Sequence, residues 1–258
     1  MIDSHCHLDF DAFDGRREQV ITDAHRAGVH TIINIGVDGP SSERSIELAE
    51  EHEGIYATVG FHPHDATKLD ADNIARLHEW TNHKKVVAIG EIGLDFYHDH
   101  SPRPIQKKAF HSQLELAAEL KMPVVIHTRD AFTETMEIVR DIARDIPGGV
   151  FHCFPGSVDE ALEVFSIGFV IGIGGAVTRQ NSPMGETAAG IPLDKIILET
   201  DAPYQKPARY KERHNCPATI RTVCEKLAEL HGTDMTEVEK ITDRTCQKLF
   251  RLVDVFGT

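Results

Sequence analysis

The stretch IDSHCHL, residues 2–8, is a short run that begins with an apolar residue and includes two histidines near its end. We predict that it forms the first β-strand, in which side chains two residues apart point to the same side. His5 and His7 then share one face, and Cys6 faces the opposite way as a packing residue. A doubly wound open sheet usually carries a glycine-rich phosphate-binding loop after its first strand. This chain places His5-Cys6-His7 there, which argues against that fold.

Seven further β-branched runs follow, separated by segments with apolar residues at helical spacing. The eight predicted strands lie near 2–8, 31–37, 55–61, 86–93, 123–128, 149–154, 168–173 and 196–200. Such alternation predicts parallel βα units. We therefore predict an α/β protein with a (β/α)8 TIM-barrel fold, in a single domain that spans 1–258. Two helical patterns after the eighth strand predict an extra C-terminal helix, with Thr236 and Glu239 as a capping pair.

The composition narrows the class of protein. The 258 residues are 41% hydrophobic, which is enough for a full core. No run of about 18 apolar residues occurs and no signal-like segment begins the chain, so we expect neither a membrane span nor secretion. The five cysteines are widely spaced and lack a C-x-x-C pair, which argues against a disulfide framework or a zinc knuckle. A cytoplasmic protein without an obligatory protein partner is expected.

The formal net charge of -14 argues against a protein that wraps long nucleic acid non-specifically, because that binding depends on many Lys and Arg contacts to phosphate. A nucleic-acid enzyme stays compatible with this charge. Carboxylates that bind metal are themselves acidic, and the bound cations offset their charge where a phosphate must lie.

Polar side chains gather where the predicted strands end, which in a barrel is the face that carries the active site. Six of the eight strands deliver a His, Asp or Glu there: His5 and His7, His62, Glu91, His127, His152, and Glu199 with Asp201. Several charged groups at the mouth of a core almost require a cation, because an unpaired buried charge is very costly. Imidazole and carboxylate ligands suit zinc, manganese, cobalt or magnesium and do not choose among them.

Other polar residues have competing interpretations. His62 suits substrate contact and structural hydrogen bonding equally well. His64, and His98 with His100 in the loop after the fourth strand, are expected to be solvated loop residues. Cys153 is expected to pack against the helices, because His152 faces inward.

Four motifs resemble the signatures of the TatD-type metal-dependent deoxyribonuclease family, in the branch that retains H-x-H on the first strand. They are HCHLD at 5–9, GFHPH at 60–64, GEIGLD at 90–95 and ETDAPY at 199–204. The resemblance implies two divalent ions. His5, His7, Glu91 and Asp201 would hold one ion, and Glu91, His127 and His152 the other. Many relatives carry Arg-Asn-Glu-Pro where this chain has His214-Asn215-Cys216-Pro217, so substrate preference does not transfer through that loop.

A hydrolase of phosphodiester bonds needs a carboxylate that takes the proton from the attacking water. We expect Asp201 in that role, with Glu199 as the reserve candidate. His62, Arg129, Tyr204 and Arg209 are expected to contact the substrate, since guanidinium groups suit phosphate and aromatic rings stack on unpaired bases. This set favours single-stranded or frayed DNA ends, and the resemblance implies 3′-5′ exonuclease action.

Two alternatives stay open at this point. One is an amidohydrolase that opens a small cyclic amide or lactone; many such barrels bridge their metals with a carboxylated lysine on the fourth strand. Here Glu91 occupies that place, and Lys84 and Lys85 precede the strand. The other alternative is a metal-binding protein without catalytic activity.

Overall fold

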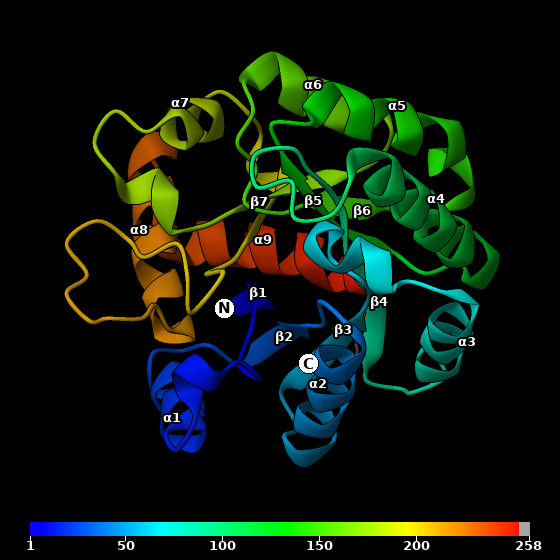
Figure 1. The fold of residues 1–258 in the computed structure, drawn as a ribbon. Coiled ribbons are helices and arrows are strands. Elements are labelled where there is room, and N and C mark those ends of the chain that lie inside the picture. The colour runs from blue at the N-terminus through cyan, green and yellow to red at the C-terminus, as the bar shows by residue number, and fades with distance from the viewer. Residues whose placement is uncertain (253–258) are drawn as a thin grey trace.

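Eight parallel strands follow one another in sequence order around one sheet, in a computed structural model that describes residues 1–252 (Figure 1). They are β1 Ile2–Cys6, β2 Thr31–Ile35, β3 Ile55–Val59, β4 Val86–Asp95, β5 Val124–Arg129, β6 Gly149–Phe151, β7 Val170–Ile173 and β8 Ile196–Leu198. The first and last strands close the circle through Ala202: Cys6 forms a parallel bridge with it, and the His7 N–H donates to its carbonyl at 2.8 Å. The predicted (β/α)8 barrel is confirmed.

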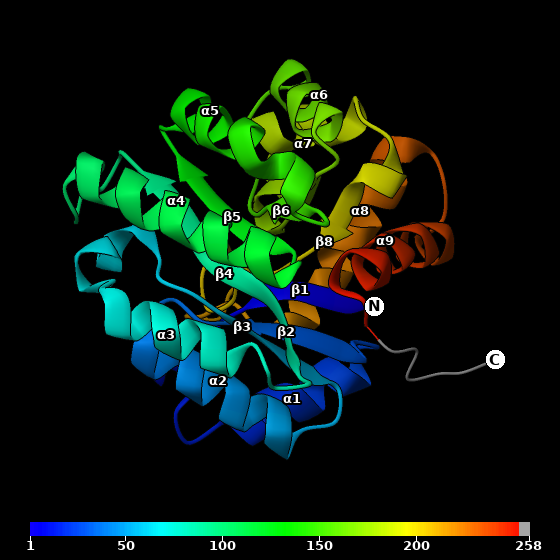
Figure 2. The same ribbon diagram turned by 90° about the vertical axis from the view of Figure 1, so that its right-hand side faces the viewer.

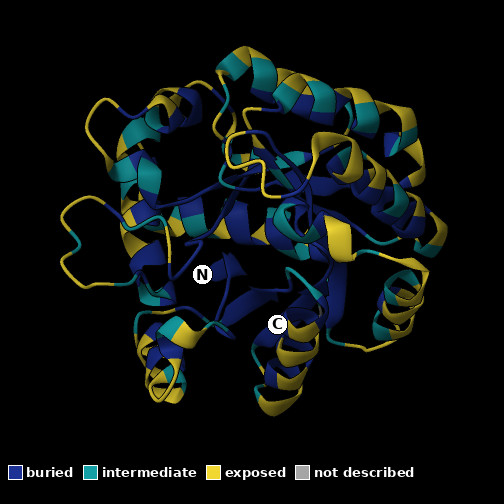
Figure 3. Cartoon of the chain, in the orientation of Figure 1, coloured by how far each residue is buried: buried dark blue, intermediate teal, exposed yellow. Residues whose placement is uncertain are grey.

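The helices form a ring outside the strands, as the second view shows (Figure 2). They are α1 Arg17–Arg26, α2 Gly39–Glu51, α3 Ala71–Trp80, α4 Arg103–Leu120, α5 Phe132–Ile142, α6 Val158–Ser166, α7 Pro183–Ala189 and α8 Ile220–His231. A further helix, α9 Met235–Phe250, packs against one end of the barrel. Buried residues cover the strands and the inner faces of the helices, while the outer faces are exposed (Figure 3). No described helix is long and apolar enough to span a membrane.

The extra C-terminal helix α9 packs at the N-terminal ends of the strands. Asp243 on α9 accepts a hydrogen bond from the Ile2 N–H at 2.9 Å. Cys246 and Phe250 of the same helix join the apolar cluster of strand residues that includes Ile2 and Val125. That end of the barrel is therefore filled by apolar side chains, and the polar site lies at the opposite end.

The predicted capping pair at the start of α9 is wrong. The N-cap is Asp234, whose carboxylate accepts from the Glu237 N–H at 2.9 Å, and Thr236 lies inside the helix. A carboxylate one residue before the helix satisfies a free N–H group of the first turn directly.

Strand lengths differ from the prediction in a way that matters for the site. β6 ends at Phe151 and β8 at Leu198, so His152 and Asp201 follow their strands rather than ending them. β4 continues to Asp95, two residues beyond the predicted limit. Gly93 lets β4 approach β5 closely, because it has φ +144° and a Cβ there would collide with the backbone carbonyl of His127.

Candidate metal centre

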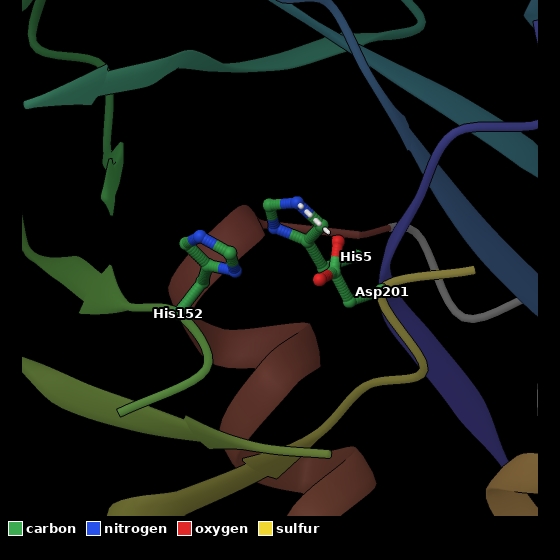
Figure 4. Close-up of side chains that lie close together, drawn as sticks. All are labelled: His5, His152 and Asp201. Carbon is green, nitrogen blue, oxygen red and sulfur yellow. Dashed lines mark ion pairs between the residues drawn. The ribbon is translucent and has the colours of Figure 1, made fainter. Parts of the chain in front are cut away.

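Four side chains from three strand ends converge at the C-terminal mouth of the barrel. The Nε2 atoms of His5 and His7 lie 3.3 Å apart. Asp201 Oδ1 lies 3.7 Å from His5 Nε2 (Figure 4). It also lies 3.5 Å from His7 Nε2, and Glu91 Oε2 lies 3.5 Å from His5 Nε2. Ligands that share one cation with bonds of about 2.1 Å stand about 3.0–3.4 Å apart, so this set is close to the spacing that a cation requires.

A second set meets the other oxygen of the same glutamate. Glu91 Oε1 lies 2.9 Å from His127 Nδ1 and 2.8 Å from His152 Nε2, and the two ring nitrogens are 3.2 Å apart. His5 and His152 stack at 4.0 Å between ring centroids, which brings the two sets side by side. Glu91 therefore presents one oxygen to each set, as a bridging carboxylate would.

His7 and His127 also have contacts on the ring nitrogens that point away from the ligand sets, and these contacts favour binding of a metal by the other nitrogen. His7 Nδ1 lies 3.2 Å from the Ile35 carbonyl, and His127 Nε2 lies 3.1 Å from Asp95 Oδ2. Each of these acceptors can hold a ring proton on the outer nitrogen, so that with an ion bound the inner nitrogen would offer its lone pair. Ring nitrogens that face one another in a buried site suit a cation between them.

The carboxylates that face the two sets are ionised. Burial raises the pKa of Glu91, but His152, His62 and His127 outweigh this effect and hold the pKa well below its usual range. Burial also opposes ionisation of Asp201, yet its hydrogen bond to His7 and the nearby imidazoles lower its pKa. Both groups are therefore negative at neutral pH and can act as ligands or accept a proton.

Glu199 is different in both position and charge. It is fully buried behind His152 and Cys153, and its Oε1 accepts from the Cys153 N–H at 2.5 Å. Burial raises the pKa of Glu199 to about 8, with His152 offsetting part of the effect and Asp201 adding to it. Its Oε2 has no hydrogen-bond partner among the described residues.

The ligand sets form the floor of an open hollow of about 1030 Å³. Three predicted substrate residues line it. His62 Nε2 lies 3.5 Å from Glu91 Oε1, and the Arg129 guanidinium lies over the Tyr97 ring at 4.3 Å. Tyr204 is 55% exposed and stands edge-on to His7.

The fourth predicted substrate residue, Arg209, lies elsewhere. It lines a neighbouring hollow of about 960 Å³ beside α7 and α8. The segment 179–182 borders both hollows, so Arg209 and the ligand sets lie on opposite sides of it.

His98 is exposed in the turn after β4, as expected, and His64 is half-buried, but the contact of both with a buried carboxylate was not expected. His64 Nε2 and His98 Nδ1 lie 3.0 Å and 2.9 Å from Asp95 Oδ2. His100 is exposed and stacks on the His64 ring at 4.4 Å. The sequence held a signal for this cluster: Asp95 stands four residues after Glu91 on one strand, so both share a face.

Cys153 packs against the hydrophobic core, as expected of a packing residue, but it does not lie wholly behind the strand. Cys153 lines the hollow and is partly exposed, with φ +44°. The strand ends at Phe151, so the alternation of a strand no longer decides which way the next side chains point. Cys6 is buried as expected, with its Sγ 3.6 Å from the Ala202 carbonyl.

Comparison with known proteins agrees with this geometry. The metal-dependent hydrolase YabD of Bacillus subtilis (strain 168) is 37% identical over 253 residues, covering 98% of this chain and 99% of that protein. The 3′-5′ ssDNA/RNA exonuclease TatD of Cronobacter sakazakii (strain ATCC BAA-894) is 36% identical, covering 97% of each chain. The crystal structure of YJJV, a TatD homolog from Escherichia coli K12, superimposes with a TM-score of 0.92 at 31% identity, covering 98% of each chain.

The family model described as TatD related DNase matches residues 2–251, which includes every strand of the barrel and every residue of both ligand sets. With relatives above 30% identity along nearly the whole chain, the protein belongs to the TatD-related DNase family.

Proposed function

We propose that the protein is a metal-dependent phosphodiester hydrolase that removes nucleotides from the 3′ ends of single-stranded or frayed DNA. The observation that carries the proposal is the position of Glu91, whose two oxygens face two separate sets of His nitrogens at the floor of an open hollow. The relative that is named a 3′-5′ ssDNA/RNA exonuclease supports the substrate class and the direction.

The donor set fits two divalent cations. His5, His7 and Asp201 would hold one ion, His127 and His152 the other, and Glu91 both. Such ions supply Lewis acidity toward phosphoryl oxygens and toward the attacking water. Nitrogen and carboxylate donors suit zinc, manganese, cobalt or magnesium.

Asp201 is the residue that we propose accepts the proton of the attacking water. Its backbone N–H donates to the His5 carbonyl at 2.8 Å, which holds the residue at the mouth of the barrel. Its Oδ1 faces His5 and His7. Its lowered pKa keeps the carboxylate ionised but makes it a weak base, so it would take a proton only from a water that is itself acidified. Glu199 is the reserve candidate, although a pKa raised to about 8 leaves it largely protonated at neutral pH and its full burial keeps it from the hollow.

The walls of the hollow suit a single strand. Arg129 offers a guanidinium to a phosphate, and Tyr204 offers an exposed ring to an unpaired base. His62 would contact the scissile nucleotide, because it lies beside Glu91. Arg209 would contact the strand only farther away, across the segment 179–182.

We place this activity in the cytoplasm, where thiols stay reduced. All five cysteines are free, and Cys6, Cys224 and Cys246 are buried.

The test is hydrolysis of single-stranded DNA labelled at its 5′ end by protein that has been stripped of metal and then reloaded with manganese, zinc, cobalt or magnesium. We expect a ladder of products shortened from the 3′ end, no reaction with chelator, and slow cleavage of closed circular duplex. A panel of lactones and cyclic amides run in parallel tests the amidohydrolase alternative. Turnover of that panel without cleavage of DNA would reject the proposal, and so would inactivity toward both with metal bound.

A further inference from the structure

A third group of metal-type ligands lies at the edge of the same hollow, around Asp95. Three imidazole nitrogens approach its Oδ2: His98 Nδ1 at 2.9 Å, His64 Nε2 at 3.0 Å and His127 Nε2 at 3.1 Å. Asp95 is fully buried, whereas the His64 and His98 side chains are 29% and 36% exposed. The cluster thus has a buried anion at its base and an open side toward the hollow.

The carboxylate of Asp95 cannot turn away from these rings. Its Oδ1 accepts from the N–H groups of Tyr97 at 3.1 Å and His98 at 2.8 Å. Gln106 holds the backbone on both sides, accepting from the Asp95 N–H at 2.8 Å and donating to its carbonyl at 3.0 Å. Oδ2 is therefore fixed, and it must satisfy all three imidazoles by itself.

One carboxylate oxygen cannot accept hydrogen bonds from three ring N–H groups, because it has about two lone-pair directions. His127 takes one of them, because with an ion of the central cluster on its Nδ1 its proton would lie on Nε2. His64 and His98 then compete for the remaining direction. A cation shared by their nitrogens and Oδ2 removes this conflict, because both rings can present lone pairs instead of protons.

We propose that His64 Nε2, His98 Nδ1 and Asp95 Oδ2 bind a third divalent cation, separate from the two ions held around Glu91. The separations of 2.9 Å and 3.0 Å between nitrogen and oxygen match ligands that share one ion with bonds of about 2.0–2.2 Å. Two imidazoles and one carboxylate favour zinc, cobalt or nickel over magnesium or calcium, which prefer oxygen ligands.

The open side of this site determines what else it would bind. His64, His98 and Arg129 all line the hollow. A cation beside Arg129 would present free coordination positions to an anionic oxygen such as that of a phosphate group. This role toward DNA rests on the proposed nuclease function, whereas metal binding at the site does not.

The test is a calorimetric titration of metal-free protein with zinc alone, comparing the wild type with the double variant His64→Gln, His98→Asn. The two amides keep an N–H donor near the positions of His64 Nε2 and His98 Nδ1, so the hydrogen bonds to Asp95 are retained, but amides bind zinc poorly. We expect about three zinc ions per wild-type chain and about two for the double variant. The control His100→Gln, which removes a ring stacked on His64 but none of the three ligands, should still bind about three.

Several results would overturn the third site. The wild type could bind only two ions, or the double variant could bind as many as the wild type. A double variant that loses an ion from the central cluster instead would show that these histidines only orient His127 through Asp95. Failure of DNA hydrolysis with each of manganese, zinc, cobalt and magnesium, in a protein that binds three zinc ions, would reject the nuclease proposal and leave this site standing, so the two proposals fail separately.

Discussion

Glu91 is the residue on which both ligand sets depend, because each of its carboxylate oxygens faces a different set. Glu91→Ala should therefore release both ions of the central cluster, where loss of a ligand to one ion would release only that ion. Metal content after equilibrium dialysis, measured by mass spectrometry, checks this expectation. Glu115→Ala, at an exposed carboxylate on α4, is the matched control and should keep full occupancy. A Glu91→Ala protein that keeps either ion would contradict the bridging role.

The role proposed for Asp201 is separable from binding, because a general base acts in the transition state and contributes little to holding the substrate. Asp201→Asn keeps the size and one ligand oxygen but removes the basic carboxylate. Turnover should fall by about two to four orders of magnitude. Affinity for single-stranded DNA, measured by fluorescence anisotropy with metal present, should change little.

The metal content of Asp201→Asn must be measured together with its kinetics. Near-normal turnover would exclude Asp201 as the base, and Glu199→Gln would then be tested. Loss of the ion held by His5 and His7 would mean that the substitution acts on a ligand.

Residues that sit on regular strands were predictable, and residues beyond the strand ends were less so. His5 and Glu91 lie within β1 and β4, where the two-residue alternation fixes which side they face. Cys153 lies past the end of β6 in a turn with positive φ, and its direction could not be read from a strand pattern. His64 was missed because its partner Asp95 is distant in the sequence.

At the level of elements, the order of strands and helices was predictable because each βα unit carries its own periodicity. The lengths of the strands were not predictable in this way. β8 has three residues, and the chain continues to Asp201 by bonding to β1, with the Asp201 N–H donating to the His5 carbonyl at 2.8 Å. Barrel closure is a contact between the two ends of the domain, which no local pattern contains.

The loop that departs from the family pattern keeps one structural function. Asn215 is fully buried, and its Nδ2 donates to the Thr200 carbonyl at 2.9 Å. Its Oδ1 accepts from the Thr219 hydroxyl at 2.7 Å. The loop is thus fastened next to Asp201 although its neighbours, His214 and Cys216, differ from the residues that many relatives carry.

The pairing of β4 with β5 gives a prediction at this scale. Gly93→Ala places a Cβ against the His127 carbonyl at a backbone φ of +144°, so the two strands must separate. We expect a loss of about 1–3 kcal/mol in the free energy of unfolding, together with weaker binding of the ion that His127 holds. Urea unfolding and zinc titration measure the two effects.

The control for Gly93→Ala is Gly168→Ala, which also introduces a side chain at positive φ but meets no atom within 4 Å. It should cost about 1 kcal/mol and leave metal binding unchanged. Equal metal binding in both variants would disprove the view that close approach of β4 and β5 sets the position of His127.

The charge of the whole molecule sets the conditions under which it can bind DNA. The net charge is -14, and three of the carboxylates that contribute to it, Glu91, Asp95 and Asp201, line the hollow. A phosphate cannot approach these carboxylates unless cations offset their charge. Affinity for a single-stranded oligonucleotide should therefore be lost in chelator and restored by metal, which anisotropy titrations at fixed ionic strength would measure.

The dependence of DNA affinity on salt concentration distinguishes the contribution of the bound cations to this affinity from that of the Lys and Arg side chains. Each phosphate contact made by Lys or Arg on a single strand contributes about -0.7 to the slope of log affinity against log salt. Because so few basic residues line the hollow, the slope should be shallow for a DNA-binding protein, and Arg129→Ala should reduce it by about one contact. Arg140→Ala, on α5 and paired with Glu163 outside the hollow, should leave the slope unchanged. A steep slope, or tight binding in chelator, would mean that DNA is held by a basic surface outside the hollow and not by the metal centre.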